Sequence, residues 1–131
     1  MINRFNEVDM EKLTAQEEEI MLIIWKQKGG CIKTFVEQLP VPQPPYTTVA
    51  SIVKNLERKA YVKSERYGNT FYYTPAIDED EYKRSFMSRM VRNYFANSYR
   101  DMVAFFVKEE HLSQEELDEI VQIIERGKPR K

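Results

Sequence analysis

The chain has 131 residues, of which 42% are hydrophobic and 31% charged, and its formal net charge is −1 at pH 7. These values are typical of one globular domain, or of one domain with a small appendage. No apolar run reaches the length of about 18 residues that predicts a membrane span. The N-terminus has no signal-peptide core, and a single cysteine, Cys31, excludes an internal disulfide framework. We therefore expect a cytoplasmic protein without a membrane segment, bound metal or cofactor.

Positive charge is concentrated in the middle of the chain. Residues 46–76 carry an excess of basic side chains, whereas residues 1–45 and 77–131 are both net negative. Because the distribution of charge matters more than its sum for a polyanionic partner, the net charge does not exclude DNA.

The first 76 residues predict a flexible arm over 1–12, then three helices and a hairpin over 13–76. Thr14 and Glu17 have the spacing of a capping box, and the helix that they begin should end at Gly29-Gly30. A short helix over 33–39 is stopped by the prolines that follow, and a third helix covers 47–60. Two strand-like runs joined by Gly68-Asn69 predict a hairpin with a two-residue loop. This order of elements is that of a winged helix-turn-helix domain.

The third helix has an apolar face and a polar, basic face when residues are placed at about 100° intervals. Small hydroxyl residues on the polar face allow close approach to base edges, and the cations further along can contact phosphates. We expect the base contacts to be made by Thr47, Thr48 and Ser51. For phosphates we expect Lys54, Asn55, Arg58, Lys63 and Arg66, of which the last two lie on the hairpin.

Residues 77–126 predict a helical dimerisation domain, followed by a disordered tail over 127–131. Ser113 and Glu116 have the spacing of a second capping box. About fifty residues in three helices have too little interior to bury so many apolar side chains. A symmetric homodimer would bury them and would match a palindromic operator. The expected dimerisation residues are Tyr82, Phe86, Met90, Tyr94, Phe105, Phe106, Leu117, Ile120, Val121 and Ile124.

An enzyme is not indicated. His111 is the single histidine and is expected at the surface, and Cys31 has no evident partner. The acidic run Glu17–Glu19 is interpreted as a solvated helix face, and Trp25 as a core residue. Two alternatives to DNA binding remain: a winged-helix protein-interaction module, and a small-molecule sensor with a pocket in the dimer core.

Several motifs resemble those of the penicillinase and methicillin-resistance repressors, a family that includes copper-transport repressors. The segment LTAQEEEIMLIIW resembles the opening motif through Leu13, Thr14, Glu17, Glu19, Ile20, Met21 and Trp25. The recognition-helix motif is matched by Tyr46, Thr47, Thr48, Val49, Leu56, Lys59 and Val62. The hairpin and the segment FVKEEHLSQEELDEI also fit, so that the resemblance covers roughly residues 10–126.

The resemblance implies a mainly α fold with a small β-hairpin and a homodimeric repressor on palindromic double-stranded DNA. In the antibiotic-responsive branch, a membrane receptor-protease system triggers cleavage of the repressor in its dimerisation domain, and the matching position here is Phe105-Phe106. This chain has Asn55 and Ala60 where the family usually has arginine and glycine, and Ala50 where some members carry a long base-contacting side chain. It lacks the C-terminal cysteine pairs of the copper branch.

Overall fold

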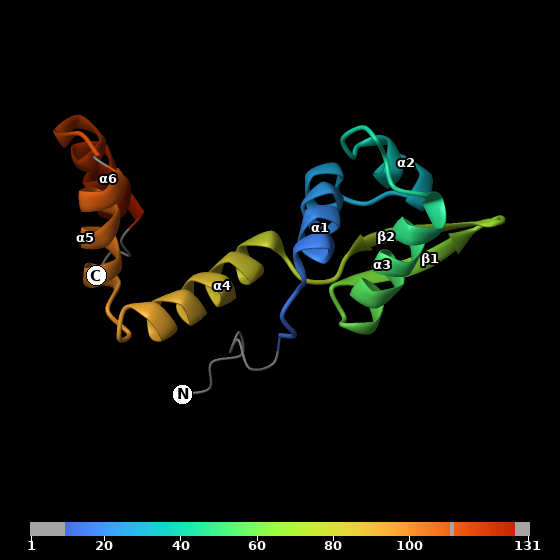
Figure 1. Cartoon of the computed structure of the whole chain (residues 1–131), viewed down its shortest axis with the longest axis horizontal. Helices are drawn as coiled ribbons and strands as arrows, with labels where there is room; N and C mark the ends of the chain where they lie inside the picture. Colours follow the sequence, from blue (N-terminus) through green and yellow to red (C-terminus); the bar gives the residue numbers. More distant parts are fainter. Residues whose placement is uncertain (1–9, 111, 128–131) are drawn as a thin grey trace. The chain divides into compact units, whose positions relative to one another are not determined.

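The computed structural model describes residues 10–110 and 112–127 (Figure 1). The order of elements is α1 (Ala15–Gln27), α2 (Ile32–Glu37), α3 (Tyr46–Arg58), β1 (Val62–Tyr67), β2 (Thr70–Pro75), α4 (Glu79–Tyr94), α5 (Tyr99–Glu110) and α6 (Gln114–Gly127). The fold is mainly helical with one antiparallel hairpin, and its first five elements form a winged helix, as predicted. The chain divides into two compact units between Met87 and Ser88, so the first turns of α4 belong with the winged helix.

Helix α1 begins at the predicted capping box. The Glu17 backbone N–H donates to Thr14 Oγ1 at 3.1 Å, and the Thr14 backbone N–H donates to Glu17 Oε1 at 2.9 Å. The helix ends slightly earlier than predicted, because the left-handed residue is Lys28, with φ 63°, rather than a glycine.

The two glycines after α1 have a different purpose, which is close approach to strand β2. Gly30 and Tyr73 exchange two backbone hydrogen bonds of 2.9 and 2.8 Å. A Cβ added at Gly29 would lie only 2.8 Å from the Tyr73 carbonyl oxygen, and the φ of Gly29 is 118°. The loop between α1 and α2 is therefore fixed to the hairpin.

Helix α3 ends in a Schellman motif that requires a left-handed residue. The Tyr61 N–H donates to the Leu56 carbonyl and the Ala60 N–H to the Glu57 carbonyl, both at 2.9 Å. Ala60 has φ 69°, a conformation that a side chain disfavours. Position 60, where the family usually has glycine and this chain has alanine, is therefore a strained position in this structure.

The hairpin has the predicted two-residue loop. Tyr67 pairs with Thr70 across Gly68-Asn69, and Val62 pairs with Pro75 at the open end. Gly68 supplies the positive φ, 62°, that the turn requires. Helix α3 packs against α1, α2 and β1, and Figure 1 shows it beside the hairpin.

One apolar core holds the winged helix together. Met10, in the segment expected to be a flexible arm, packs against this core. The core residues come from every element of the winged helix and from the start of α4: Ile20, Met21, Ile24, Trp25, Ile32, Phe35, Leu39, Val49, Val53, Leu56, Tyr61, Val62, Tyr73 and Tyr82.

Tyr82 requires a correction, since we expected it in a dimer interface. Its ring centroid lies 5.3 Å from that of Trp25 and 5.9 Å from that of Tyr61, and only 8% of the residue is exposed. Its hydroxyl donates to Glu18 Oε2 at 2.8 Å. Tyr82 is therefore a core residue of the winged helix, which explains why the first turns of α4 belong to that unit.

The second unit contains the end of α4 together with α5 and α6. Helix α6 begins at the predicted capping box, where Ser113 and Glu116 exchange hydrogen bonds of 3.0 and 3.1 Å. Phe105 packs against Phe95 and Phe106, with ring centroids 5.6 and 5.8 Å apart. Many apolar side chains of this unit remain exposed: Tyr94, Tyr99, Val103, Phe105, Ile120, Val121 and Ile123.

The other expected dimerisation residues have varied exposure. Met90, Phe106 and Leu117 are half-buried, and Phe86, which belongs to the first unit, is exposed. The side chain of Ile124, the position of His111 and the tail over 128–131 lie outside the described residues.

Candidate nucleic-acid interface

Helix α3 separates its two faces sharply. Val49, Val53 and Leu56 are fully buried in the core. The polar side carries the predicted set, and all of its members are exposed: Thr47, Thr48, Ser51, Lys54, Asn55 and Arg58. The structure thus brings the predicted base-contacting residues together on the first two turns of one helix.

The hairpin adds two exposed cations. Lys63 is the second residue of β1 and is exposed, and Arg66 lies near the turn, where its Nε donates to the Gly68 carbonyl at 2.9 Å. The Arg66 guanidinium carbon also lies 5.9 Å from the centre of the Phe71 ring. These contacts hold the Arg66 side chain near the tip of the wing.

Two nearby carboxylates are engaged by hydroxyl groups. Ser64 donates to Glu57 Oε2 and Tyr67 donates to Glu65 Oε1, each at 2.7 Å. Arg58 has an acidic neighbour as well, since its Nη1 lies 3.9 Å from Glu11 Oε1. Both side chains of that pair are exposed, so the contact is weak and leaves the guanidinium accessible to a phosphate.

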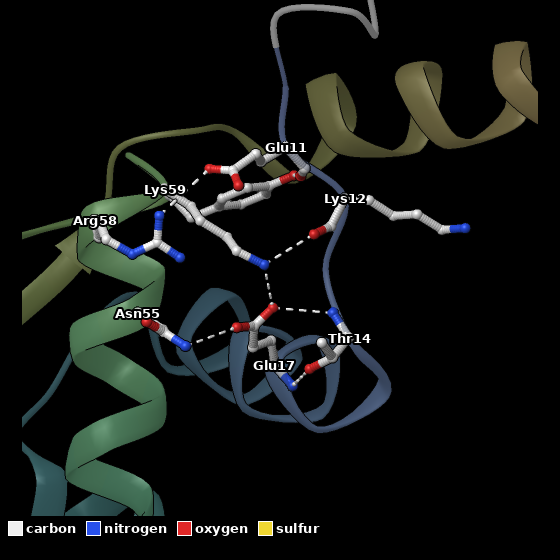
Figure 2. Close-up of polar contacts among 8 residues, drawn as sticks. Glu11, Lys12, Thr14, Glu17, Asn55, Arg58 and Lys59 are labelled. Atoms are coloured by element: carbon white, nitrogen blue, oxygen red, sulfur yellow. Dashed lines mark hydrogen bonds and ion pairs between the residues drawn. The ribbon is translucent and has the colours of Figure 1, made fainter.

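Behind this surface, a buried polar network joins the C-terminal end of α3 to the start of α1 (Figure 2). Lys59 Nζ donates to Glu17 Oε1 at 2.7 Å and to the Lys12 carbonyl at 2.9 Å. The side chain of Lys59 is only 9% exposed and that of Glu17 only 5%. The Asn55 amide donates to the other carboxylate oxygen, Glu17 Oε2, at 3.4 Å. Glu17 therefore caps the N-terminus of α1 and also holds the C-terminal end of α3 in place.

The network determines the ionisation of Glu17. Burial raises the pKa of this carboxyl, but the hydrogen bond from Lys59 and the Thr14 backbone N–H, with further help from the charge of Lys59 and the Asn55 amide, outweighs burial. The pKa of Glu17 is consequently below its ordinary value, and the carboxylate is charged at neutral pH.

The structure corrects the interpretation of the acidic run as a solvated face. Glu17 is 4% exposed, Glu18 is half-buried beneath the Tyr82 hydroxyl, and Glu19 alone is exposed. The Asn55 amide, expected at a phosphate, is directed toward Glu17 in Figure 2. No local pattern predicts these contacts, because Glu17 lies 42 positions before Lys59 and 38 before Asn55.

Lys33 was missed by the sequence interpretation, and Tyr46 was named only as part of the recognition-helix motif and not as a DNA-contacting residue. They line a hollow of about 490 Å³ beside the polar face of α3, together with Lys54 and residues of the hairpin. The spacing of Tyr46, Ala50 and Lys54, which places them in one row along a helix, was the available signal.

Neither a metal centre nor a spanning helix is found in the described part of the chain. Residues 10–110 and 112–127 contain no group of three His, Cys, Asp or Glu side chains placed to hold a metal ion. No helix within those ranges has the length and apolar character needed to cross a membrane.

The family model of the penicillinase repressor matches residues 13–126, which is most of the chain. The chain belongs to the penicillinase repressor family. It is 27% identical to the penicillinase repressor of Bacillus licheniformis over 121 residues, covering 92% of this chain and 94% of that protein. It is 22% identical to the methicillin resistance regulatory protein MecI of Mammaliicoccus sciuri over 116 residues, covering 88% of this chain and 94% of that protein.

Two solved structures also align with this chain. The DNA-binding domain of the repressor BlaI aligns with a TM-score of 0.48 at 26% identity, covering 54% of this chain and 88% of that one. The hsRosR-S4 complex aligns with a TM-score of 0.53 at 14% identity, covering 80% of this chain and 95% of that one, which is a similarity of fold alone.

Proposed function

We propose that this chain is a cytoplasmic transcriptional repressor that binds a palindromic DNA operator as a homodimer. The observation that carries the proposal is the exposed polar face of α3, where Thr47, Thr48 and Ser51 precede Lys54 and Arg58. Small residues at the start of a recognition helix approach base edges, and cations further along fix the register on phosphates. Membership of a repressor family and the names of its relatives support the same function.

The homodimer is supported by the apolar surface of the second unit. Ile120, Val121 and Ile123 are exposed on α6, and Phe105 is exposed on α5. Exposed apolar side chains in such number are characteristic of an interaction site, and a two-fold symmetric dimer would place two recognition helices on the two half-sites of a palindrome.

Release of the operator would follow from cleavage between Phe105 and Phe106 by a membrane receptor-protease system. Separated winged helices would each bind a half-site with the low affinity of one DNA-binding unit, without the gain from a linked second unit. They would therefore dissociate at cellular concentrations. The Phe105–Phe106 bond lies inside α5, so a protease must first unwind that part of the helix. Mass spectrometry of the repressor from cells exposed to a β-lactam would find this cleavage product or exclude this route.

DNA binding is tested by electrophoretic shift with genomic fragments at two salt concentrations. A specific operator complex gives a discrete shift that weakens at the higher salt, because bound phosphates release counterions. Thr47→Ala combined with Ser51→Ala should reduce the preference for selected fragments over unrelated DNA while preserving the salt dependence. A protein-interaction module would give no specific, salt-sensitive shift, and that result would reject the repressor function.

A further inference from the structure

A groove runs beside the recognition helix and is formed by three elements of the winged helix. Helix α2 and the residue before it provide one wall, one side of α3 provides the second, and the hairpin from its turn into β2 provides the third. Its volume is about 490 Å³. The residues that line it are Cys31, Ile32, Lys33, Tyr46, Ala50, Lys54, Asn69, Thr70, Phe71 and Tyr73.

The charge of this groove is entirely positive. Lys33 from α2 and Lys54 from α3 both line it, and none of its ten lining residues is acidic. Both lysines are exposed, and neither forms an ion pair or hydrogen bond within the described ranges, in contrast to Lys59 and Arg58. Two unpaired cations from different elements around one hollow are complementary to an anionic chain.

The remaining walls suit the sugars of such a chain. Tyr46 and Phe71 are large, half-exposed aromatic residues, and Ala50 lines the same hollow with a small side chain. Asn69 and Thr70, at the turn, add polar groups that can bond to phosphate oxygens. The stripe of Tyr46, Ala50 and Lys54 lies next to the stripe of Thr47 and Ser51, which is the side proposed to face bases.

We propose that this groove holds the sugar–phosphate backbone of one DNA strand at the edge of the half-site, with Lys33 and Lys54 on its phosphates. This inference rests on the proposed function and adds Lys33, Tyr46 and Phe71 to the DNA interface. Arg66, whose guanidinium carbon lies 5.9 Å from the centre of the Phe71 ring, then adds a cation on the hairpin side of the groove. The recognition helix and the wing are thus joined by one continuous backbone contact.

The first test compares Lys33→Ala and Lys54→Ala with Lys26→Ala in the full-length dimer. Lys26 is an exposed lysine on α1 that does not line the groove, so it controls for the loss of one positive charge. Fluorescence anisotropy measures affinity for an operator fragment and an unrelated fragment over a range of salt concentrations. Each groove variant should lower the slope of log K against log[salt] by about 0.9 for both fragments, because one phosphate contact is lost. Lys26→Ala should match the wild type.

The second test locates the contact. Single phosphates of the operator are replaced in turn by uncharged methylphosphonates, and each probe is measured with the wild type and Lys33→Ala. At the contacted position the replacement should weaken binding by the wild type and have little further effect on the variant. Equal weakening of both proteins at every position would overturn the proposal.

The outcomes separate the groove from the function of the whole chain. Failure of the wild type to bind any DNA would reject the proposed function. Normal wild-type binding with a Lys33→Ala slope equal to that of Lys26→Ala would reject the groove alone. Ala50→Leu provides an uncharged check: it fills the hollow, and with an unchanged circular dichroism spectrum it should still lower affinity. Unaltered affinity in that variant would also count against a backbone in the groove.

Discussion

Lys59 Nζ lies 2.7 Å from Glu17 Oε1, and this pair connects the end of the recognition helix to the start of α1. Both side chains are almost completely removed from water, and the Thr14 N–H and the Asn55 amide also donate to the carboxylate. Breaking a buried pair is costly because it leaves one charge without compensation. The position of α3, and therefore of its exposed polar face, depends on this contact.

Lys59→Met should destabilise the winged helix by about 3 kcal/mol, since it leaves the Glu17 carboxylate buried without its cation. The free energy of unfolding is measured by urea titration with Trp25 fluorescence as the signal, because the single tryptophan is buried in the same unit. The double variant Lys59→Met with Glu17→Gln should recover part of the lost stability, because the unpaired charge is removed. Lys83→Met is the matched control: Lys83 forms only an exposed pair with Glu79 at 4.0 Å, and its loss should cost less than about 0.5 kcal/mol. Equal effects of the two lysine variants would contradict the buried pair.

The stability of the winged helix should fall in acid through Glu17. Its pKa is lower in the folded protein than the value of about 4.3 for an unfolded chain. The contribution of the carboxylate is therefore complete above the unfolded pKa and is lost as the pH falls through the folded value. The difference in unfolding free energy between wild type and Glu17→Gln should be constant near neutral pH and shrink below about pH 4. In the Lys59→Met background this pH dependence should be much weaker; an unchanged dependence would assign it to another group.

Ala60→Gly should stabilise the protein by about 1 kcal/mol, because glycine adopts the left-handed conformation at φ 69° without the steric cost of a Cβ. The exposed side chain of Ala60 makes little packing that the change would remove. The same substitution at Ala50, inside α3, should destabilise by about 1 kcal/mol. Thermal unfolding of both variants tests the opposite signs. A loss of stability in Ala60→Gly would mean that strain at this helix end is unimportant.

Local signals predicted local structure well. The Thr14–Glu17 and Ser113–Glu116 capping boxes and the Gly68-Asn69 turn each depend on residues within a few positions of one another, and all form as expected. The two faces of α3 also follow from its own periodicity. Tyr82 illustrates the limit: its spacing along α4 indicated an apolar stripe, but the partners of that stripe, Trp25 and Tyr61, are determined by tertiary packing.

The candidate site shows the same division between local and long-range information. The exposed hydroxyl and basic residues of α3 were predictable from one helix. The bond from Asn55 to Glu17 and the inclusion of Lys33 in the groove were not, because each requires two elements to meet. Sequence patterns report the face of an element, whereas the partner of that face is decided by the fold.

Val121→Asp should convert the proposed dimer to monomers, since it places a charge on the exposed apolar side of α6, one helical turn from Leu117. A carboxylate buried without a partner at a symmetric interface is present twice, so its desolvation penalty is doubled. Gln122→Asp adds the same charge on the same helix at an exposed polar position and should leave the dimer intact. Light scattering gives the mass of each variant, and circular dichroism shows that the helices remain. Operator affinity should fall only in Val121→Asp, because its two winged helices no longer bind together. A folded Val121→Asp variant that still has the mass of a dimer would exclude this face of α6 from the interface.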